Sequence, residues 1–213
     1  MNLSWFIKYL YKNLKKFIMK LKITSILLLA VIASFSFIAF TLKDDVYKVD
    51  LTKSSITWEG KKFAGSHKGT VELTSGNLNF NGKKLTGGGF IANMTTIKDA
   101  DKNGGLEKHL KSEDFFGVEK FPAANFVIKK IEGNGASVNI TGDLTIKSIT
   151  APITFPATLV WNADKTVTAT ADKITVDRTK YGIQFKSKSV FANIGDNFIY
   201  DEFTLSVKLV AAK

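Results

Sequence analysis

The side chains best suited to chemistry or to recognition of a polar group are two histidines and a single arginine. His109 lies at the end of a predicted short helix, close to the carboxylates of Glu113 and Asp114. An imidazole at this position either hydrogen-bonds the headgroup of a ligand or caps the carboxyl end of the helix, where positive charge is favoured. We favour the structural role and keep His109 as a candidate headgroup contact.

Arg178 and His67 are the other two candidates. A guanidinium forms bidentate pairs with carboxylates. Arg178 therefore either holds its own loop through such a pair, which we favour, or contacts a ligand headgroup. His67 lies within the turn-rich stretch Gly65-Ser66-His67-Lys68-Gly69 and is expected to be simply exposed.

Metal binding and catalysis have little support in the sequence. Two distant histidines and scattered carboxylates do not show the spacing of a zinc site, which needs three or four ligands. The absence of cysteine excludes thiolate nucleophiles and cysteine-based metal sites. No G-x-S-x-G, P-loop or dinucleotide-binding motif is present. We predict no metal, no cofactor and no enzymatic activity. An enzyme would require His109 to be buried beside a carboxylate and a serine in an open pocket.

The net charge of +11 does not indicate a nucleic-acid partner. Residues 1–43 contain seven lysines and no acidic residue, so residues 44–213 carry a net charge of only +4. Nucleic-acid-binding domains cluster Arg and Lys on one face, whereas this chain has one arginine. We therefore predict no nucleic-acid binding.

Residues 23–42 form an uncharged, largely apolar segment preceded by lysines. Such a segment is typical of a signal peptide, with Met1 or Met19 as its start. Twenty uncharged residues would also span a bilayer, so an uncleaved membrane anchor, with membrane contact through this segment, is the alternative. In both cases the lysines keep the amino-terminal side in the cytoplasm. We expect residues 44–213 to be exported, either periplasmic or secreted, and residues 1–43 to be the signal peptide or anchor.

From Val46 onward, apolar and polar residues alternate with a period of two, which predicts β-strands. The clearest run is 138–147, where Val138, Ile140, Leu144 and Ile146 share one face. Turn signals such as Asn81-Gly82 separate the runs, which indicates an antiparallel sheet. Such strands close into a barrel or pack as a sandwich.

Two segments depart from this alternation. Residues 103–111 place Leu106 and Leu110 at positions i and i+4, which predicts a short helix ending before Ser112 that covers one end of a barrel. Residues 178–197 have poor periodicity and are expected to form a loop or a broken strand. No repeat or linker divides residues 44–213, so we predict one domain.

A barrel of about eight strands has an interior that either side chains fill or one small ligand occupies. Large apolar residues on the alternating faces are candidates for either a packed core or the lining of a ligand cavity. The candidate lining residues are Trp58, Phe90, Phe126, Val138, Ile140, Leu144, Ile146, Phe155, Trp161 and Leu205. Residues Gly87-Gly88-Gly89 are compatible with a hollow interior, and equally with coiling of the strand.

Several motifs resemble one family. The segment 109–122, His-Leu-Lys-Ser-Glu-Asp-Phe-Phe-Gly-Val-Glu-Lys-Phe-Pro, resembles the signature of the YceI-like family of lipid- and polyisoprenoid-binding proteins. Residues 142–150 resemble its G-x-L-T-I-K-G-V-T strand and turn, and 177–183 its R-x-x-aromatic-G segment. The start at 47–50 and the closing strand at 194–209 also match. Ser148 stands where the family often has Gly, and Gly117 where it often has Asp; both departures fall at predicted turns.

This resemblance implies an all-β, lipocalin-like antiparallel barrel in an exported protein. It also implies a ligand with a long apolar tail, either an isoprenoid or a fatty-acyl lipid. An envelope structural or stress protein with a barrel filled by side chains is the alternative, and a barrel enzyme acting on a lipid-like substrate is the weakest one.

Overall fold

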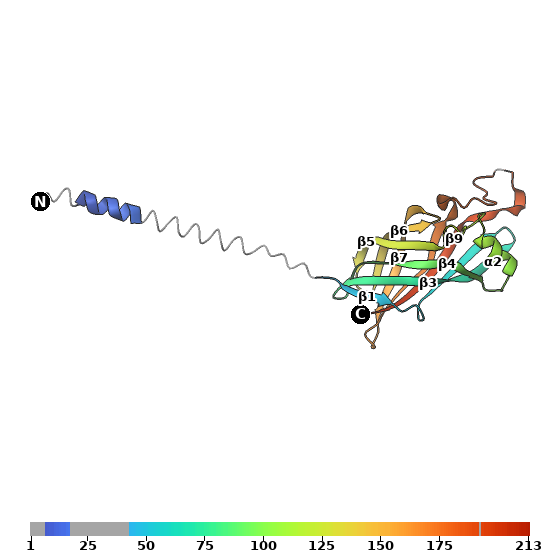
Figure 1. Cartoon of the computed structure of the whole chain (residues 1–213), viewed down its shortest axis with the longest axis horizontal. Helices are drawn as coiled ribbons and strands as arrows, with labels where there is room; N and C mark the ends of the chain where they lie inside the picture. Colours follow the sequence, from blue (N-terminus) through green and yellow to red (C-terminus); the bar gives the residue numbers. More distant parts are fainter. Residues whose placement is uncertain (1–6, 18–42, 192) are drawn as a thin grey trace. The chain divides into compact units, whose positions relative to one another are not determined.

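The structure is a computed structural model that describes residues 7–17, 43–191 and 193–213. Residues 43–213 form one unit, and the described residues before them belong to a separate one. Nine strands build the larger unit, and Figure 1 shows how they are arranged. They are β1 (Asp45–Val49), β2 (Ser55–Lys62), β3 (Gly65–Asn81), β4 (Lys84–Asp99), β5 (Ala123–Asn134), β6 (Ser137–Ile146), β7 (Ile149–Trp161), β8 (Val167–Asp177) and β9 (Ile199–Ala212).

Eight of these strands close into an antiparallel barrel. The hydrogen-bonded order runs β3-β2-β9-β8-β7-β6-β5-β4, and pairing of β3 with β4 closes the ring. Strand β1 pairs with both β3 and β9 at one end. The prediction of a lipocalin-like barrel is thereby confirmed, and the sandwich alternative is wrong because β3 and β4 pair with each other.

The alternation of apolar and polar residues explains which side chains of each strand point into the barrel. In β6, Val138, Ile140, Gly142, Leu144 and Ile146 are all buried, while the alternate residues between them are half-buried or exposed. The register of β6 against β7 sets Ile140 opposite Phe155, so apolar side chains from both strands enter the same interior. Among the described residues, the buried core residues lie between Val49 and Ala211. This unit thus contains a complete core of its own.

The predicted short helix is present as α2 (Gly104–Lys111). The side chain of Asn103 accepts a hydrogen bond from the amide of Leu106 and caps its amino end, and Ser112 caps the other end. Leu110 is buried and Leu106 packs against the core. The segment predicted to be irregular, 178–197, contains two short 3-10 helices among its described residues, η1 (Arg178–Tyr181) and η2 (Gly195–Asn197), and Phe198 leads from it into β9.

A second helix, at residues 7–17, had not been predicted. Its apolar residues Ile7, Leu10 and Leu14 recur at helical spacing, which favours an amphipathic helix. No helix among the described residues is long and apolar enough to cross a membrane. The apolar segment 23–42, the predicted signal peptide or anchor, lies outside the described residues.

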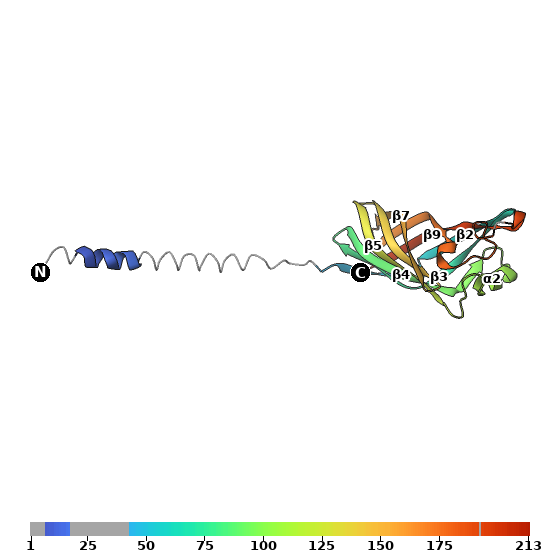
Figure 2. The same ribbon diagram turned by 90° about the horizontal axis from the view of Figure 1, so that it is seen from above.

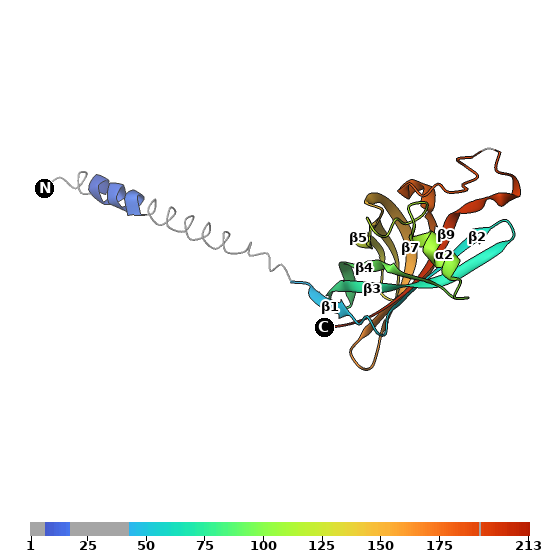
Figure 3. The ribbon, with the colours of Figure 1, turned by 45° about the vertical axis from the view of Figure 1, so that its right-hand side comes forward.

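The two ends of the barrel differ. Helix α2, the β2–β3 hairpin and the segment 182–198 gather at one end, while β1 and the carboxyl terminus lie at the other (Figures 2 and 3). At this second end, Phe80 meets the edges of Tyr47 and Trp161, with ring centroids 5.2 and 5.0 Å away. Aromatic side chains therefore fill the barrel there, and the open space lies toward the helix.

Candidate functional site

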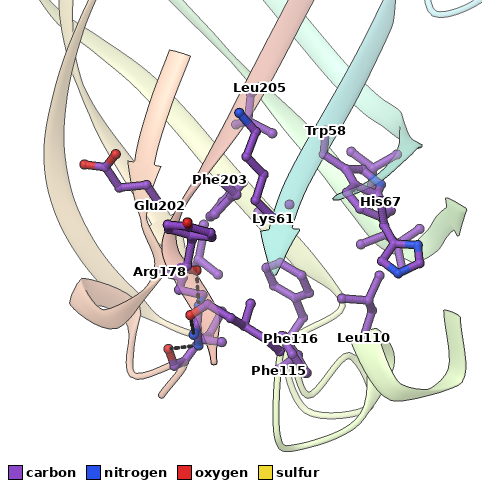
Figure 4. A pocket seen from close by; sticks show the side chains of 18 of the residues that line it. Trp58, Lys61, His67, Leu110, Phe115, Phe116, Arg178, Glu202, Phe203 and Leu205 are labelled. Carbon is purple, nitrogen blue, oxygen red and sulfur yellow. Dashed lines mark hydrogen bonds between the residues drawn. The ribbon is translucent and has the colours of Figure 1, made fainter. Parts of the chain in front are cut away.

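A cavity of about 600 Å³ occupies the half of the barrel nearest α2. Its wall is built by inward-facing apolar residues of all eight barrel strands, together with Leu106 and Leu110 of α2. Seven of the ten predicted lining residues meet there. They are Trp58, Phe90, Phe126, Leu144, Ile146, Phe155 and Leu205. Figure 4 shows the side chains around this cavity.

Three predicted lining residues do not line this cavity. Ile140 borders a separate space of about 40 Å³ deeper in the barrel. Val138 and Trp161 line neither space. Both lie toward the filled end, where Trp161 packs on Tyr47 at a centroid distance of 5.6 Å. Alternation identified their inward orientation but not their depth along the barrel axis.

Three phenylalanines form the floor of the main cavity. Phe126 packs between Phe90 and Phe155, with ring centroids 5.5 and 5.4 Å apart. All three residues also line the smaller space, so their rings separate the two. The main cavity, followed inward from its opening near α2 (its mouth), therefore ends on this aromatic floor.

Gly142 in β6 allows this floor to form. A Cβ at position 142 would lie 2.3 Å from Cζ of Phe126 and 2.6 Å from the carbonyl oxygen of Val127. The Phe126 ring can therefore lie against the β6 backbone only because the residue is glycine. In β4, which pairs with β5, a Cβ at position 89 would lie 2.4 Å from the carbonyl oxygen of Phe126. This supports the interpretation that the glycine run serves strand coiling.

Arg178 is buried and bonds mainly to the backbone. Its Nε donates to the carbonyl of Tyr200 at 3.1 Å, Nη1 to that of Ile183 at 2.9 Å, and Nη2 to that of Ile199 at 3.0 Å. The contact between Nη2 and Asp201 is a single one at 3.4 Å, so the bidentate pair we favoured is not formed. Arg178 touches the cavity wall, but its donors hold segment 182–198 against β9.

Burial shifts the pKa values of this loop anchor. Desolvation lowers the pKa of the Arg178 guanidinium, an effect that Asp201 and Asp177 partly oppose. Burial and the charge of Asp177 raise the pKa of Tyr181 to about 12, and its hydroxyl has no hydrogen-bond partner in the described chain. Burial alone would raise the pKa of Asp201, but hydrogen bonds from Ser187 and Ser189 and the Arg178 charge lower it.

His109 lines the cavity wall from α2. Its Nε2 lies 3.1 Å from Oδ2 of Asp114, and its ring packs edge-on against Phe115 and Phe185 at 4.9 and 4.7 Å. The side chain is 38% exposed, and the Ser112 hydroxyl donates to the His109 backbone carbonyl. The buried His–Ser–carboxylate arrangement that would favour an enzyme is not formed at His109.

His67 is not the exposed turn residue that we expected. It lies within β3 and lines the cavity, where Figure 4 shows it on the same wall as Trp58. Its Nδ1 is buried, 3.7 Å from Oδ1 of the buried carboxylate Asp99. The glycines around it, which suggested a turn, instead belong to the β2–β3 hairpin strands. Among the described residues, no three His, Cys, Asp or Glu side chains gather to hold a metal ion.

Sequence reasoning missed the cavity residues supplied by segment 182–198. Ile183, Phe185 and Phe198 all line the cavity, and Ile183 and Phe198 are buried. Periodicity could not identify them because the segment is irregular. Isolated large apolar residues within a polar loop were the available signal.

Comparison with known proteins agrees with this architecture. The YceI-like domain family matches residues 47–211. Escherichia coli protein YceI is 30% identical over 96 residues, which are 45% of this chain and 50% of the relative, so the chain spans about half of that relative's length.

Two solved structures share the fold. Burkholderia cenocepacia BcnA aligns with a TM-score of 0.65 at 23% identity, covering 77% of this chain and 99% of that one. A polyisoprenoid-binding domain from Saccharophagus degradans, implicated in plant cell wall breakdown, aligns with a TM-score of 0.59 at 10% identity, covering 78% and 97%. At these identities the likeness concerns the fold alone.

Proposed function

The chain belongs to the YceI-like domain family, and from this premise we propose that its barrel binds the long apolar tail of an isoprenoid or fatty-acyl amphiphile. The observation that carries the proposal is the apolar cavity of about 600 Å³, closed at its floor by phenylalanines. A structural barrel filled by side chains would not leave such a space. The polyisoprenoid-binding domain of similar fold adds support.

The binding energy would come from the tail. Each buried methylene contributes roughly 0.8 kcal/mol, so a long chain binds well with few polar contacts. A charged headgroup is costly in an apolar interior and would remain at the mouth near α2. His109 is the predicted headgroup contact that stays available there, since the donors of Arg178 are directed to backbone carbonyls.

We also propose that residues 44–213 act outside the cytoplasm as a carrier rather than an enzyme. The lysine-rich side of residues 23–42 supports export with this orientation. The carrier role rests on the apolar wall of the cavity and on two side-chain contacts. His109 contacts Asp114, and the Ser112 hydroxyl donates to the backbone carbonyl of His109 rather than to its ring.

Titration of the protein with prenyl alcohols and fatty acids of graded length tests the proposal. Affinity should rise with chain length and then reach a plateau, because the cavity has a fixed depth. Phe155→Glu places a charge at the floor and should abolish binding. Its control is Val160→Glu, which changes an exposed residue of the same strand and should bind as wild type does.

If Phe155→Glu fails to fold, Leu205→Trp provides a second test, because the larger side chain occupies space within the cavity. This variant should accept only shorter chains. Absence of saturable binding to every chain by the folded wild-type protein would reject the proposal.

A further inference from the structure

Large apolar side chains are exposed around the mouth of the cavity. Phe63, at the tip of the β2–β3 hairpin, is 56% exposed. Val190 and Phe191, in segment 182–198, are 42% and 49% exposed. Large apolar groups clustered in this way mark an interaction surface rather than ordinary solvent contact.

The hairpin tip and the segment form one continuous surface. The amide of Phe63 donates to the carbonyl of Phe198 at 3.4 Å, and their ring centroids are 5.9 Å apart. Ser187 bridges to Ile199, and Arg178 holds the base of the segment. Figures 2 and 3 show the two segments side by side at the same end of the barrel.

Four exposed lysines lie among these apolar side chains: Lys61, Lys62, Lys186 and Lys188. None of them forms an ion pair with a carboxylate within the part of the chain that the structure describes. Lys188 instead places its Nζ 4.8 Å from the centroid of Phe198. Two acidic residues, Asp196 and Glu202, also line the cavity, and Asp201 faces Arg178. Glu59 on β2 pairs with Lys68 rather than with a rim lysine. We call the four lysines with Phe63, Val190 and Phe191 the mouth rim.

The composition of the mouth rim matches the surface of an anionic bilayer. Aromatic side chains are favoured at the level of lipid headgroups. Unpaired lysines beside them are attracted to anionic headgroups, and each adds to the affinity. Part of the mouth rim also lines the cavity: Lys61, Lys62, Phe63 and Lys186. A surface that covers the rim therefore faces the opening of the cavity.

We infer that the mouth rim docks the barrel on an anionic lipid surface, with the cavity opening toward the bilayer. The inference rests on the proposed function and extends it. An amphiphile could then pass between membrane and cavity without exposing its tail to water, a step in which no covalent bond changes.

Flotation with vesicles tests the docking. Residues 43–213, which contain a complete core, would be mixed with vesicles of phosphatidylcholine alone or with added phosphatidylglycerol. We expect binding only to the anionic vesicles and weaker binding as salt rises. The double variant Lys62→Glu and Lys188→Glu should bind at least about tenfold more weakly. Phe63→Ser should weaken binding without changing its salt dependence.

The matched control reverses the same amount of charge at the filled end. Lys83 and Lys165 lie in the turns at that end, and replacing both with Glu should leave vesicle binding unchanged. Titration of Lys188→Glu and Phe191→Ser with a soluble short-chain alcohol separates this inference from the proposed function. Neither residue lines the cavity, so both variants should retain alcohol binding while they bind anionic vesicles more weakly than the wild type does. Three results would overturn the inference. The first is equal weakening of vesicle binding by both double variants, and the second is no binding to anionic vesicles. The third is a change in oligomeric state, rather than in vesicle binding, when the rim is altered.

Discussion

The side chain of Phe126 limits the depth of the main cavity. Its ring lies against Gly142 and separates the main cavity from the space of about 40 Å³ below it. Phe126→Leu or Phe126→Ala should join the two spaces, so that the longest chain bound with full affinity becomes longer. Chain-length titration measures this effect.

Ile146→Ala is the control for Phe126, since Ile146 lines only the main cavity and its truncation widens the cavity without deepening it. Phe126→Ala should also lower the free energy of unfolding by about 3–5 kcal/mol. Phe126→Leu removes fewer buried atoms and is included as the variant expected to remain folded. An unchanged length limit in a folded Phe126 variant would show that the aromatic floor does not set it.

At the residue scale, sequence patterns predicted which side chains face inward but not what each one meets. Val138 and Leu144 share a face of β6, yet only Leu144 reaches the main cavity. We expected Arg178 to pair with a carboxylate, but it donates mainly to backbone carbonyls that lie 5 to 22 residues away in the chain. The positions of those carbonyls depend on tertiary structure, which no local spacing reveals.

At the element scale, the β6–β7 hairpin explains a departure from the family pattern. Lys147 and Ser148 both have positive φ, 50° and 62°, as a two-residue hairpin of this type requires. Glycine adopts this conformation without steric cost, which explains why the family often has Gly where this chain has Ser148.

Replacing Ser148 with glycine should therefore stabilise the protein. We expect Ser148→Gly to raise the free energy of unfolding by about 0.5 kcal/mol, because relief of the left-handed backbone exceeds the entropy that glycine loses. Denaturant unfolding measures the change. Ser148→Ala also lacks the hydroxyl but keeps a Cβ, and it should bring no gain; an equal gain from both variants would refute the backbone explanation.

Elements with regular periodicity were the ones that the sequence predicted well. Strand β6 and helix α2 lie within one residue of their expected bounds. His67 was misplaced because glycines on both sides suggested a turn, whereas Gly69 fits beneath the ring of Trp58 within the sheet. The irregular segment 178–197 was recognised as irregular, but its buried apolar residues were not.

At the scale of the whole molecule, the closure of the barrel was predicted by the resemblance rather than by the strands themselves. Alternating strands are equally compatible with a sandwich. Closure depends on the pairing of β3 with β4 and of β2 with β9, and the second pair joins segments well over 100 residues apart. The size of the cavity is likewise a property of all the inward side chains together.

If the barrel is a lipid carrier, its cavity holds a single apolar chain. Native mass spectrometry of gently purified residues 43–213 tests it most directly, before and after extraction with organic solvent. We expect the protein mass to be increased by one amphiphile with a long apolar tail, which is lost on extraction and restored when the extract is added back. A protein that carries no such lipid, and that binds none when prenyl alcohols or fatty acids are supplied, would contradict it.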